Sequence, residues 1–145
     1  MTDRQATTKW AGDLPSGSGE TTLDTSGVAS FAVSWPARAE ESGGKTSPEE
    51  LIAAAHSACY CMQFSGLLGK AGTPPESIRT TATVSFGPKE GGFEIKGIAL
   101  TVRAAVPGTD PGTFAEIAQQ AKETCPVSAA LAGTQITLDA ALDGA

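Results

Sequence analysis

A stretch of apolar residues near the middle of the chain predicts a helix that is apolar on almost every face. Residues 48–68 read PEELIAAAHSACYCMQFSGLL, and after Glu50 the clearly polar side chains are only four, those of His56, Ser57, Gln63 and Ser65. A helix of this kind is buried in a protein core or in a membrane. Because polar residues interrupt the run, we expect it to belong to a protein core rather than to span a bilayer.

The start of this helix carries a recognisable capping pattern. Ser47 is a good N-cap residue, Pro48 suits the first helical position, and Glu50 stands three residues after Ser47. Together they form the sequence pattern of a capping box. We therefore expect the helix to begin at residue 48, with Glu49 left over for another role.

Alternation of apolar and polar residues predicts strands before and after the helix. The candidate strands are residues 7–10, 19–25, 28–35 (stopped by Pro36), 78–86, 93–106 and 134–142, and a turn at 88–92 makes a hairpin of the fourth and fifth. Shorter helices are expected at 114–123 and 127–132. The chain has 145 residues, which suits one hydrophobic core. We predict a single α+β domain, residues 1–145, with a largely antiparallel sheet and a buried central helix.

Charge and the composition of the first residues narrow the class of protein. The formal net charge is −6 and the pI is about 4.7. This balance argues against a nucleic-acid binder with a basic surface and disfavours an anionic membrane partner. Residues 1–12 are polar and lack the apolar run of a signal peptide, so we expect a cytoplasmic protein.

The three cysteines are the main candidates for chemistry. An odd, small number is not a structural disulfide framework. Cys59 alone reads as a small core residue. However, His56 lies three residues before it on the same helical face, and Cys125 precedes Pro126 at a predicted helix N-terminus, where a thiolate is favoured. Two such thiols suggest attack by one and resolution by the other.

Zinc is an alternative use of the same residues. The chain has four side chains of the types that zinc prefers, those of His56, Cys59, Cys61 and Cys125. The spacing is poor for a metal, because Cys59 and Cys61 are two residues apart and point in different directions on a helix. We therefore predict no metal site, and interpret Cys61 as a packing residue, with a spare redox thiol as its alternative role.

Arg38 and Glu49 form a second candidate pair. A thiolate in an apolar site needs a compensating cation, and arginine stays charged when buried. Glu49 is free to hold Arg38; the alternative is that both belong to a solvated loop and helix start. Glu49 and Cys59 are ten residues apart, about 15 Å along a helix, so one guanidinium cannot easily reach both on the same helix. Two such helices packed antiparallel, one from each subunit, would solve this and predict an interlocked homodimer.

Two separated motifs resemble a known family. TSPEELIAAAHSAC at residues 46–59 and KETCPVS at 122–128 closely resemble the OsmC (osmotically inducible protein C) and Ohr (organic hydroperoxide resistance protein) family, and the first motif is closer to the OsmC branch. The resemblance also covers residues 10–13, 72–86, 98–108 and 136–139.

This resemblance implies a thiol-dependent peroxidase that forms an intertwined homodimer. It assigns Cys59 as the peroxidatic cysteine, Cys125 as the resolving cysteine, Glu49 as the carboxylate that positions the active-site arginine, and Arg38 as that arginine. Cys59 would attack a hydroperoxide and become a sulfenic acid, and Cys125 would condense with it to a disulfide. Cys61 departs from the family pattern and leaves an alternative disulfide open.

The same resemblance sets the expected partners. We expect organic hydroperoxides to be better substrates than hydrogen peroxide, with a role in oxidative or osmotic stress defence. No cofactor is expected; an external thiol, for example a dithiol such as dihydrolipoamide, would reset the enzyme. Partners other than the substrate, the reductant and a second subunit, such as nucleic acid or membrane, are not expected. The rival interpretations are a non-enzymatic thiol redox sensor and a zinc-binding stress protein.

Overall fold

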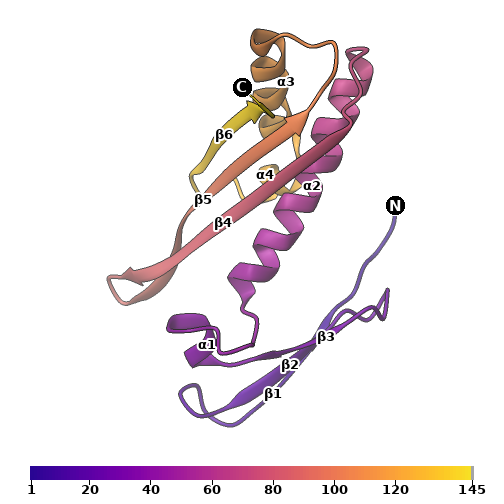
Figure 1. Ribbon diagram of the computed structural model, residues 1–145. Coiled ribbons are helices and arrows are strands. Elements are labelled where there is room, and N and C mark those ends of the chain that lie inside the picture. The colour runs from indigo at the N-terminus through magenta and orange to yellow at the C-terminus, as the bar shows by residue number, and fades with distance from the viewer. Residues whose placement is uncertain (145) are drawn as a thin grey trace. The chain divides into compact units, whose positions relative to one another are not determined.

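A computed structural model describes residues 1–144, which fall into two compact units (Figure 1). The first is Met1–Leu51 and the second begins at Ile52. The order of the elements along the chain follows the prediction, with strands, a long helix, a hairpin, two shorter helices and a last strand, except that a short helix at Trp35–Ala39 precedes the long one.

The first unit contains a small antiparallel sheet. Its strands are β1 (Thr7–Ala11), β2 (Ser18–Thr22) and β3 (Ser30–Val33), and they pair in the order β1-β2-β3. Trp10 lies opposite Gly19 in the register of β1 and β2. A Cβ at Gly19 would come within 2.8 Å of the Trp10 ring, so this position requires glycine for the ring to lie across it.

The third strand is shorter than predicted, because the chain turns into a helix. The strand ends at Val33, and α1 (Trp35–Ala39) follows at once. Ser34 caps α1, since its hydroxyl oxygen accepts a hydrogen bond from the Ala37 N–H at 3.3 Å. Pro36 therefore lies in the first turn of a helix, where proline is tolerated, and the prediction that it only stops a strand was wrong.

The long helix α2 (Pro48–Lys70) begins where the capping pattern predicts. Ser47 Oγ accepts from the Glu50 N–H at 3.1 Å. The capping box is only half formed, however, because the Glu50 carboxylate accepts from Thr46 Oγ1. Glu49 is thereby left for a different partner, as predicted.

Only one face of α2 is buried within the described chain. Buried residues recur every four positions, at His56, Tyr60, Phe64 and Leu68. The opposite face is exposed, and Met62 on it is 74% exposed. The prediction of a helix buried on all sides is therefore not met by the 144 described residues. By length and composition α2 could also cross a membrane, a property that core helices of other proteins share.

The second unit contains a three-stranded sheet in the order β4-β5-β6. The strands β4 (Ser77–Lys89) and β5 (Gly92–Ala105) form a long antiparallel hairpin. Its turn is shorter than predicted, since only two residues separate the strands and Gly91 takes up a φ of 79°. The last strand, β6 (Ile136–Leu142), lies parallel to β5. The fold is α+β as predicted, but with two small sheets in place of one.

The core of the second unit lies on one face of this sheet. Every second residue of β5 from Ile98 to Ala104 is buried, which places the core face against α2 and α3 (Pro111–Thr124). The buried apolar residues of these three elements form one cluster, with Tyr60, Phe64, Leu68, Leu100, Val102, Phe114 and Ala118 among its members. Phe64 packs between Tyr60 and Phe114, with ring centroids 5.6 and 5.4 Å away. This packing fixes α2 and α3 side by side.

Candidate active site

Two thiols from distant parts of the sequence meet in the second unit. Cys59 is half-buried on α2, and Cys125 is buried at the junction between α3 and α4 (Pro126–Ala130). Pro126 lacks an N–H and disfavours helical backbone at Cys125, so α3 ends there and Cys125 takes up an extended conformation. The two sulfur atoms lie 3.0 Å apart and share a hydrogen bond.

The surroundings of the two sulfurs move their pKa values in opposite directions. Burial, followed by the hydrogen bond with Cys125, raises the pKa of Cys59, against the opposing effect of the Val127 N–H. Burial also acts to raise the pKa of Cys125, but hydrogen bonding with Cys59 and Ser128 outweighs it and lowers that pKa. Cys125 is therefore the more acidic of the two thiols. No Lys or Arg takes part in these shifts among the described residues.

A buried histidine lies next to the thiol pair. His56 is 0% exposed, and its Nε2 lies 2.8 Å from Ser128 Oγ on α4. Its other ring nitrogen, Nδ1, has no hydrogen-bond partner among the described residues. Burial lowers the pKa of His56, so the ring is neutral near neutral pH. Ser128 was missed in the sequence analysis; its place two residues after Pro126, on the turn that follows Cys125, was the only available signal.

Arg38 and Glu49 form an ion pair in the first unit. The Glu49 carboxylate accepts from Arg38 Nη2 at 2.8 Å and from Arg38 Nε at 3.0 and 3.2 Å. The Glu49 side chain is 8% exposed and that of Arg38 34% exposed. Bidentate contacts of this kind fix the plane of a guanidinium and hold it for an anion. The structure thus brings together the two residues that the sequence analysis paired.

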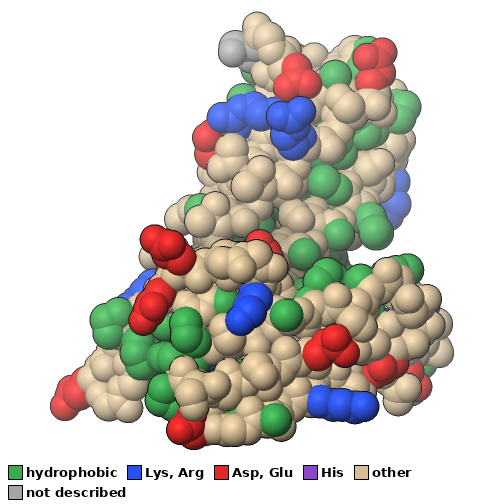
Figure 2. Space-filling model, turned by 60° about the horizontal axis from the view of Figure 1, so that its bottom comes forward, with side chains coloured by type: hydrophobic (Ala, Val, Ile, Leu, Met, Phe, Trp, Pro, Cys, Tyr) green, Lys and Arg blue, Asp and Glu red, His purple; other side chains and the backbone are tan. Residues whose placement is uncertain are grey.

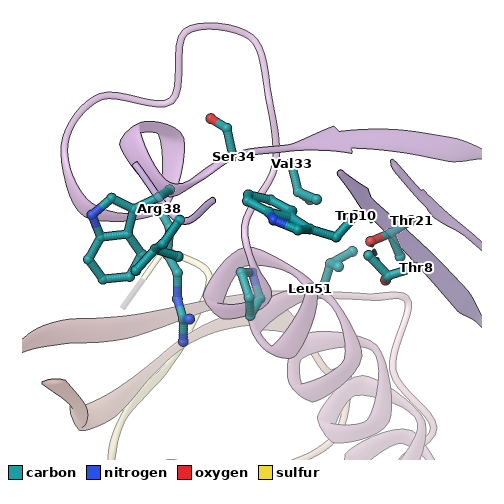
Figure 3. Close-up of a pocket in the computed structure, with 10 residues that line it drawn as sticks. Thr8, Trp10, Thr21, Val33, Ser34, Arg38 and Leu51 are labelled. Atoms are coloured by element: carbon teal, nitrogen blue, oxygen red, sulfur yellow. Dashed lines mark hydrogen bonds between the residues drawn. The ribbon is translucent and has the colours of Figure 1, made fainter. Parts of the chain in front are cut away.

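An apolar cavity of about 330 Å³ adjoins Arg38 in the first unit (Figure 3). Trp10, Val33 and Leu51 form part of its wall, and the Trp10 ring lies between Val33 and Leu51. Thr8 and Thr21 line one side and share a hydrogen bond of 2.8 Å. Arg38 is the cation in this largely apolar lining. The sequence analysis did not predict which residues would line a cavity.

Cys61 lies away from the thiol pair. It is half-buried, and its sulfur forms a hydrogen bond of 3.1 Å with Thr80 Oγ1 on β4. Among residues 1–144 no group of three or more His, Cys, Asp or Glu side chains is arranged to hold a metal ion. The four candidate zinc ligands of the sequence analysis are therefore not gathered in one place.

Charges on the face shown in Figure 2 are mixed. Lys and Arg side chains are scattered among Asp and Glu side chains on that face, and they form no extended basic patch there. This distribution agrees with the net charge of −6 and gives no sign of a nucleic-acid surface on that face.

Comparison with known proteins decides the family. The family model described as OsmC-like protein matches residues 41–139. The chain belongs to the OsmC-like protein family. Peroxiredoxin OsmC of Escherichia coli K12 is 45% identical over 130 residues, which are 90% of each chain. The resemblance given by the two cysteine motifs is therefore confirmed, and this OsmC-like protein is a relative of peroxide-detoxifying redox proteins.

Solved structures of the same family share the fold. The organic hydroperoxide resistance protein OhrB of Bacillus subtilis matches with a TM-score of 0.75 and 27% identity, over 94% of this chain and 98% of that chain. An organic hydroperoxide resistance protein from Elizabethkingia anophelis matches with a TM-score of 0.77 and 26% identity, over 99% and 98% of the two chains. The α+β architecture of this OsmC-like protein is thus that of its family.

Proposed function

We propose that this protein is a thiol-dependent peroxidase that reduces organic hydroperoxides to alcohols. The observation that carries the proposal is the distance of 3.0 Å between the sulfurs of Cys59 and Cys125, which are 66 positions apart in the sequence. Two free thiols at this separation need little movement to form a disulfide, and one of them is half-exposed to an incoming substrate. The names of the relatives, peroxiredoxin and organic hydroperoxide resistance protein, support the same reaction class.

The proposed reaction has three balanced steps. The Cys59 thiolate attacks the distal oxygen of the hydroperoxide, the O–O bond breaks, the alcohol leaves with a proton, and Cys59 becomes a sulfenic acid. The Cys125 sulfur then attacks the sulfenic sulfur, and water leaves as the disulfide forms. An external dithiol, dihydrolipoamide being one candidate, supplies two electrons and two protons to restore both thiols. No cofactor is needed for any of these steps.

Arg38 is the proposed cation for the Cys59 thiolate. Burial raises the pKa of Cys59, so the thiolate needs a positive partner near neutral pH. Arg38 is held by Glu49 in a bidentate ion pair and carries further N–H groups. Glu49 and Cys59 lie ten residues apart on α2, about 15 Å, which one guanidinium cannot easily cover.

A homodimer with composite sites is the proposed solution to this separation. The exposed face of α2, with Met62 at its centre, is apolar enough to pack against the same face of a second copy. Antiparallel packing would bring Arg38 of one subunit towards Cys59 of the other. The cavity beside Arg38 would then accept the apolar part of an organic hydroperoxide, which supports a preference for organic peroxides over hydrogen peroxide. We also propose that the protein is cytoplasmic and acts in stress defence.

The test combines turnover with oligomeric state. Reduced protein is mixed with an organic hydroperoxide and a dithiol, and peroxide consumption is followed; sedimentation at micromolar concentration gives the mass. The peroxidase with composite sites predicts sustained turnover by a dimer. Oxidation of the thiols by peroxide without turnover would support the rival function, a redox sensor, and a monomer with full activity would refute the composite site.

A further inference from the structure

A buried hydrogen bond joins α2 to the helical turn that follows the resolving cysteine. His56 Nε2 lies 2.8 Å from Ser128 Oγ, and both side chains are buried, at 0% and 6% exposure. The Ser128 side chain, three residues after Cys125, is among the hydrogen-bonding groups that lower the pKa of Cys125. The series runs from His56 on α2 through Ser128 on α4 to the residue that joins α3 and α4. The mechanism above assigns no role to His56 or Ser128.

The direction of these hydrogen bonds follows from the number of protons available. The hydroxyl of Ser128 has a single proton. When it donates that proton to the Cys125 sulfur, its oxygen can only accept from His56, so Nε2 of His56 has to carry a proton. The other ring nitrogen of His56, Nδ1, has no partner among the described residues, which fits a neutral ring protonated at Nε2. A lowered pKa, caused by burial, keeps the ring neutral.

We propose that His56 is a positioning residue for the resolving thiol: its Nε2–H orients the Ser128 hydroxyl to donate to Cys125 and so stabilises the Cys125 thiolate. This inference rests on the proposed function in one respect, the assignment of Cys125 as the resolving cysteine. The stabilised thiolate attacks the sulfenic sulfur of Cys59, an S–S bond forms, the S–O bond breaks, and the departing hydroxide takes one proton to leave as water. A more acidic Cys125 is a larger fraction of thiolate near neutral pH, so the disulfide forms faster.

The experiment has to account for the groups next to Cys125 that titrate themselves. Cys59 and Tyr60 face it from α2, and Ser128 and the Val127 N–H from α4. Burial keeps the pKa of Tyr60 above its ordinary value, so Tyr60 stays protonated through the range of the experiment. Cys59 also titrates, and its sulfur forms a hydrogen bond with the Cys125 thiol. The measurement therefore uses protein in which Cys59 is replaced.

The experiment titrates Cys125 in full-length protein carrying Cys59→Ser and Cys61→Ser. Ultraviolet absorbance of the thiolate gives the pKa, and the rate of alkylation by iodoacetamide gives its reactivity. We expect Ser128→Ala and His56→Leu to raise the pKa of Cys125 and to slow alkylation at neutral pH by about fivefold, the factor that one ordinary hydrogen bond gives. Ser128→Thr and His56→Gln each keep a donor and should restore most of the rate.

The matched control is Tyr60→Phe, which removes a different buried hydrogen bond from the same face of α2. Tyr60 Oη donates to the Ala118 carbonyl at 2.8 Å and lies outside the His56–Ser128 series. We expect Tyr60→Phe to leave the alkylation rate within about twofold of the background. Should His56→Leu fail to fold, His56→Met removes the same donor in its place, and Ser128→Ala, which deletes only one oxygen, tests the contact with Cys125. An unchanged titration in folded Ser128→Ala, or an equal change in Tyr60→Phe, would overturn the inference.

A second measurement separates this inference from the proposed function. Protein with Cys59 intact receives one equivalent of hydroperoxide, and sulfenic acid and disulfide are followed in time. Ser128→Ala should form sulfenic acid at the normal rate and the disulfide about fivefold more slowly. Absence of sulfenic acid in all variants would refute the proposed function, while the titration of Cys125 would still test its hydrogen bonds by itself.

Discussion

Replacement of Glu49 by glutamine tests whether this carboxylate holds Arg38 for catalysis. Three contacts join the two side chains: Arg38 Nε to both carboxylate oxygens, at 3.0 and 3.2 Å, and Nη2 to Oε1 at 2.8 Å. In Glu49→Gln the amide oxygen can take the place of Oε1 and keep two of these contacts. The amide NH₂ then faces the Arg38 Nε–H, so the third contact becomes repulsive and the ionic attraction is lost.

The size of the effect follows from the burial of the pair. Hydrogen bonds to charged groups contribute about 1.5–3 kcal/mol. Glu49 is nearly buried, but the Arg38 side chain is 34% exposed, and water screens part of the attraction. We therefore expect Glu49→Gln to lower the free energy of unfolding by about 1–2 kcal/mol. If the same energy holds Arg38 in its catalytic position, kcat/KM for an organic hydroperoxide should fall by about tenfold, since 1.4 kcal/mol corresponds to a factor of ten.

The assay compares urea unfolding and peroxide consumption in the wild type, Glu49→Gln and Glu50→Gln. Glu50 is the matched control, because it lies in the same helical turn and loses the same charge, but it is exposed and accepts from Thr46 instead of Arg38. The control should keep kcat/KM within about twofold. If Glu49→Gln and Glu50→Gln behave alike in both measurements, the reasoning about Arg38 is refuted.

Three further predictions concern the core, the buried histidine and the third thiol. Phe64→Ala removes a fully buried ring between two aromatic neighbours and should cost about 3–5 kcal/mol in urea unfolding; a loss below about 1 kcal/mol would contradict the packing. The pKa of His56 is lowered by burial from its ordinary value of 6.5, so the unfolded chain binds more protons, and stability should fall as the pH drops below about 6.5 towards the folded pKa. His56→Gln should remove that part of the pH dependence, and an unaltered profile would argue against it. Cys61→Ser should leave turnover and the Cys59–Cys125 disulfide intact, because Cys61 contacts Thr80; peptide mapping that finds a disulfide through Cys61 would contradict this.

Local signals in the sequence predicted where two of the helices begin or end. The helix start at Pro48 follows from Ser47 and Glu50, whose capping interaction is local and is present at 3.1 Å. The end of α3 at Cys125 follows from Pro126 in the same way. These two predictions succeeded because they rest on interactions within a few residues. Glu49 was paired with Arg38, eleven residues away, because Glu50 was expected to cap the helix; the pairing is present although the Glu50 carboxylate accepts from Thr46 instead.

The features that the sequence analysis missed depend mostly on tertiary contacts. The short helix α1 is the exception: its Ser34 cap is a local contact, but the apolar run before Pro36 was interpreted as a strand. The parallel pairing of β6 with β5 depends on how the chain returns after α4, which no periodicity reveals. Ser128 acquires a role only where α4 meets His56. The burial of α2 on one face only also has no local signal, since its composition is apolar on both faces.

The most direct test of the peroxidase is consumption of cumene hydroperoxide by reduced protein with a dithiol, measured beside Cys59→Ser and Cys125→Ser. We predict rapid turnover by the wild type, loss of peroxide reaction in Cys59→Ser, and a Cys59–Cys125 disulfide in oxidised wild type, as the sulfur separation of 3.0 Å implies. In Cys125→Ser we predict that Cys59 is still oxidised once and then accumulates as sulfenic acid. Absence of turnover, with Cys59 unreactive towards peroxide in the folded protein, would contradict the account.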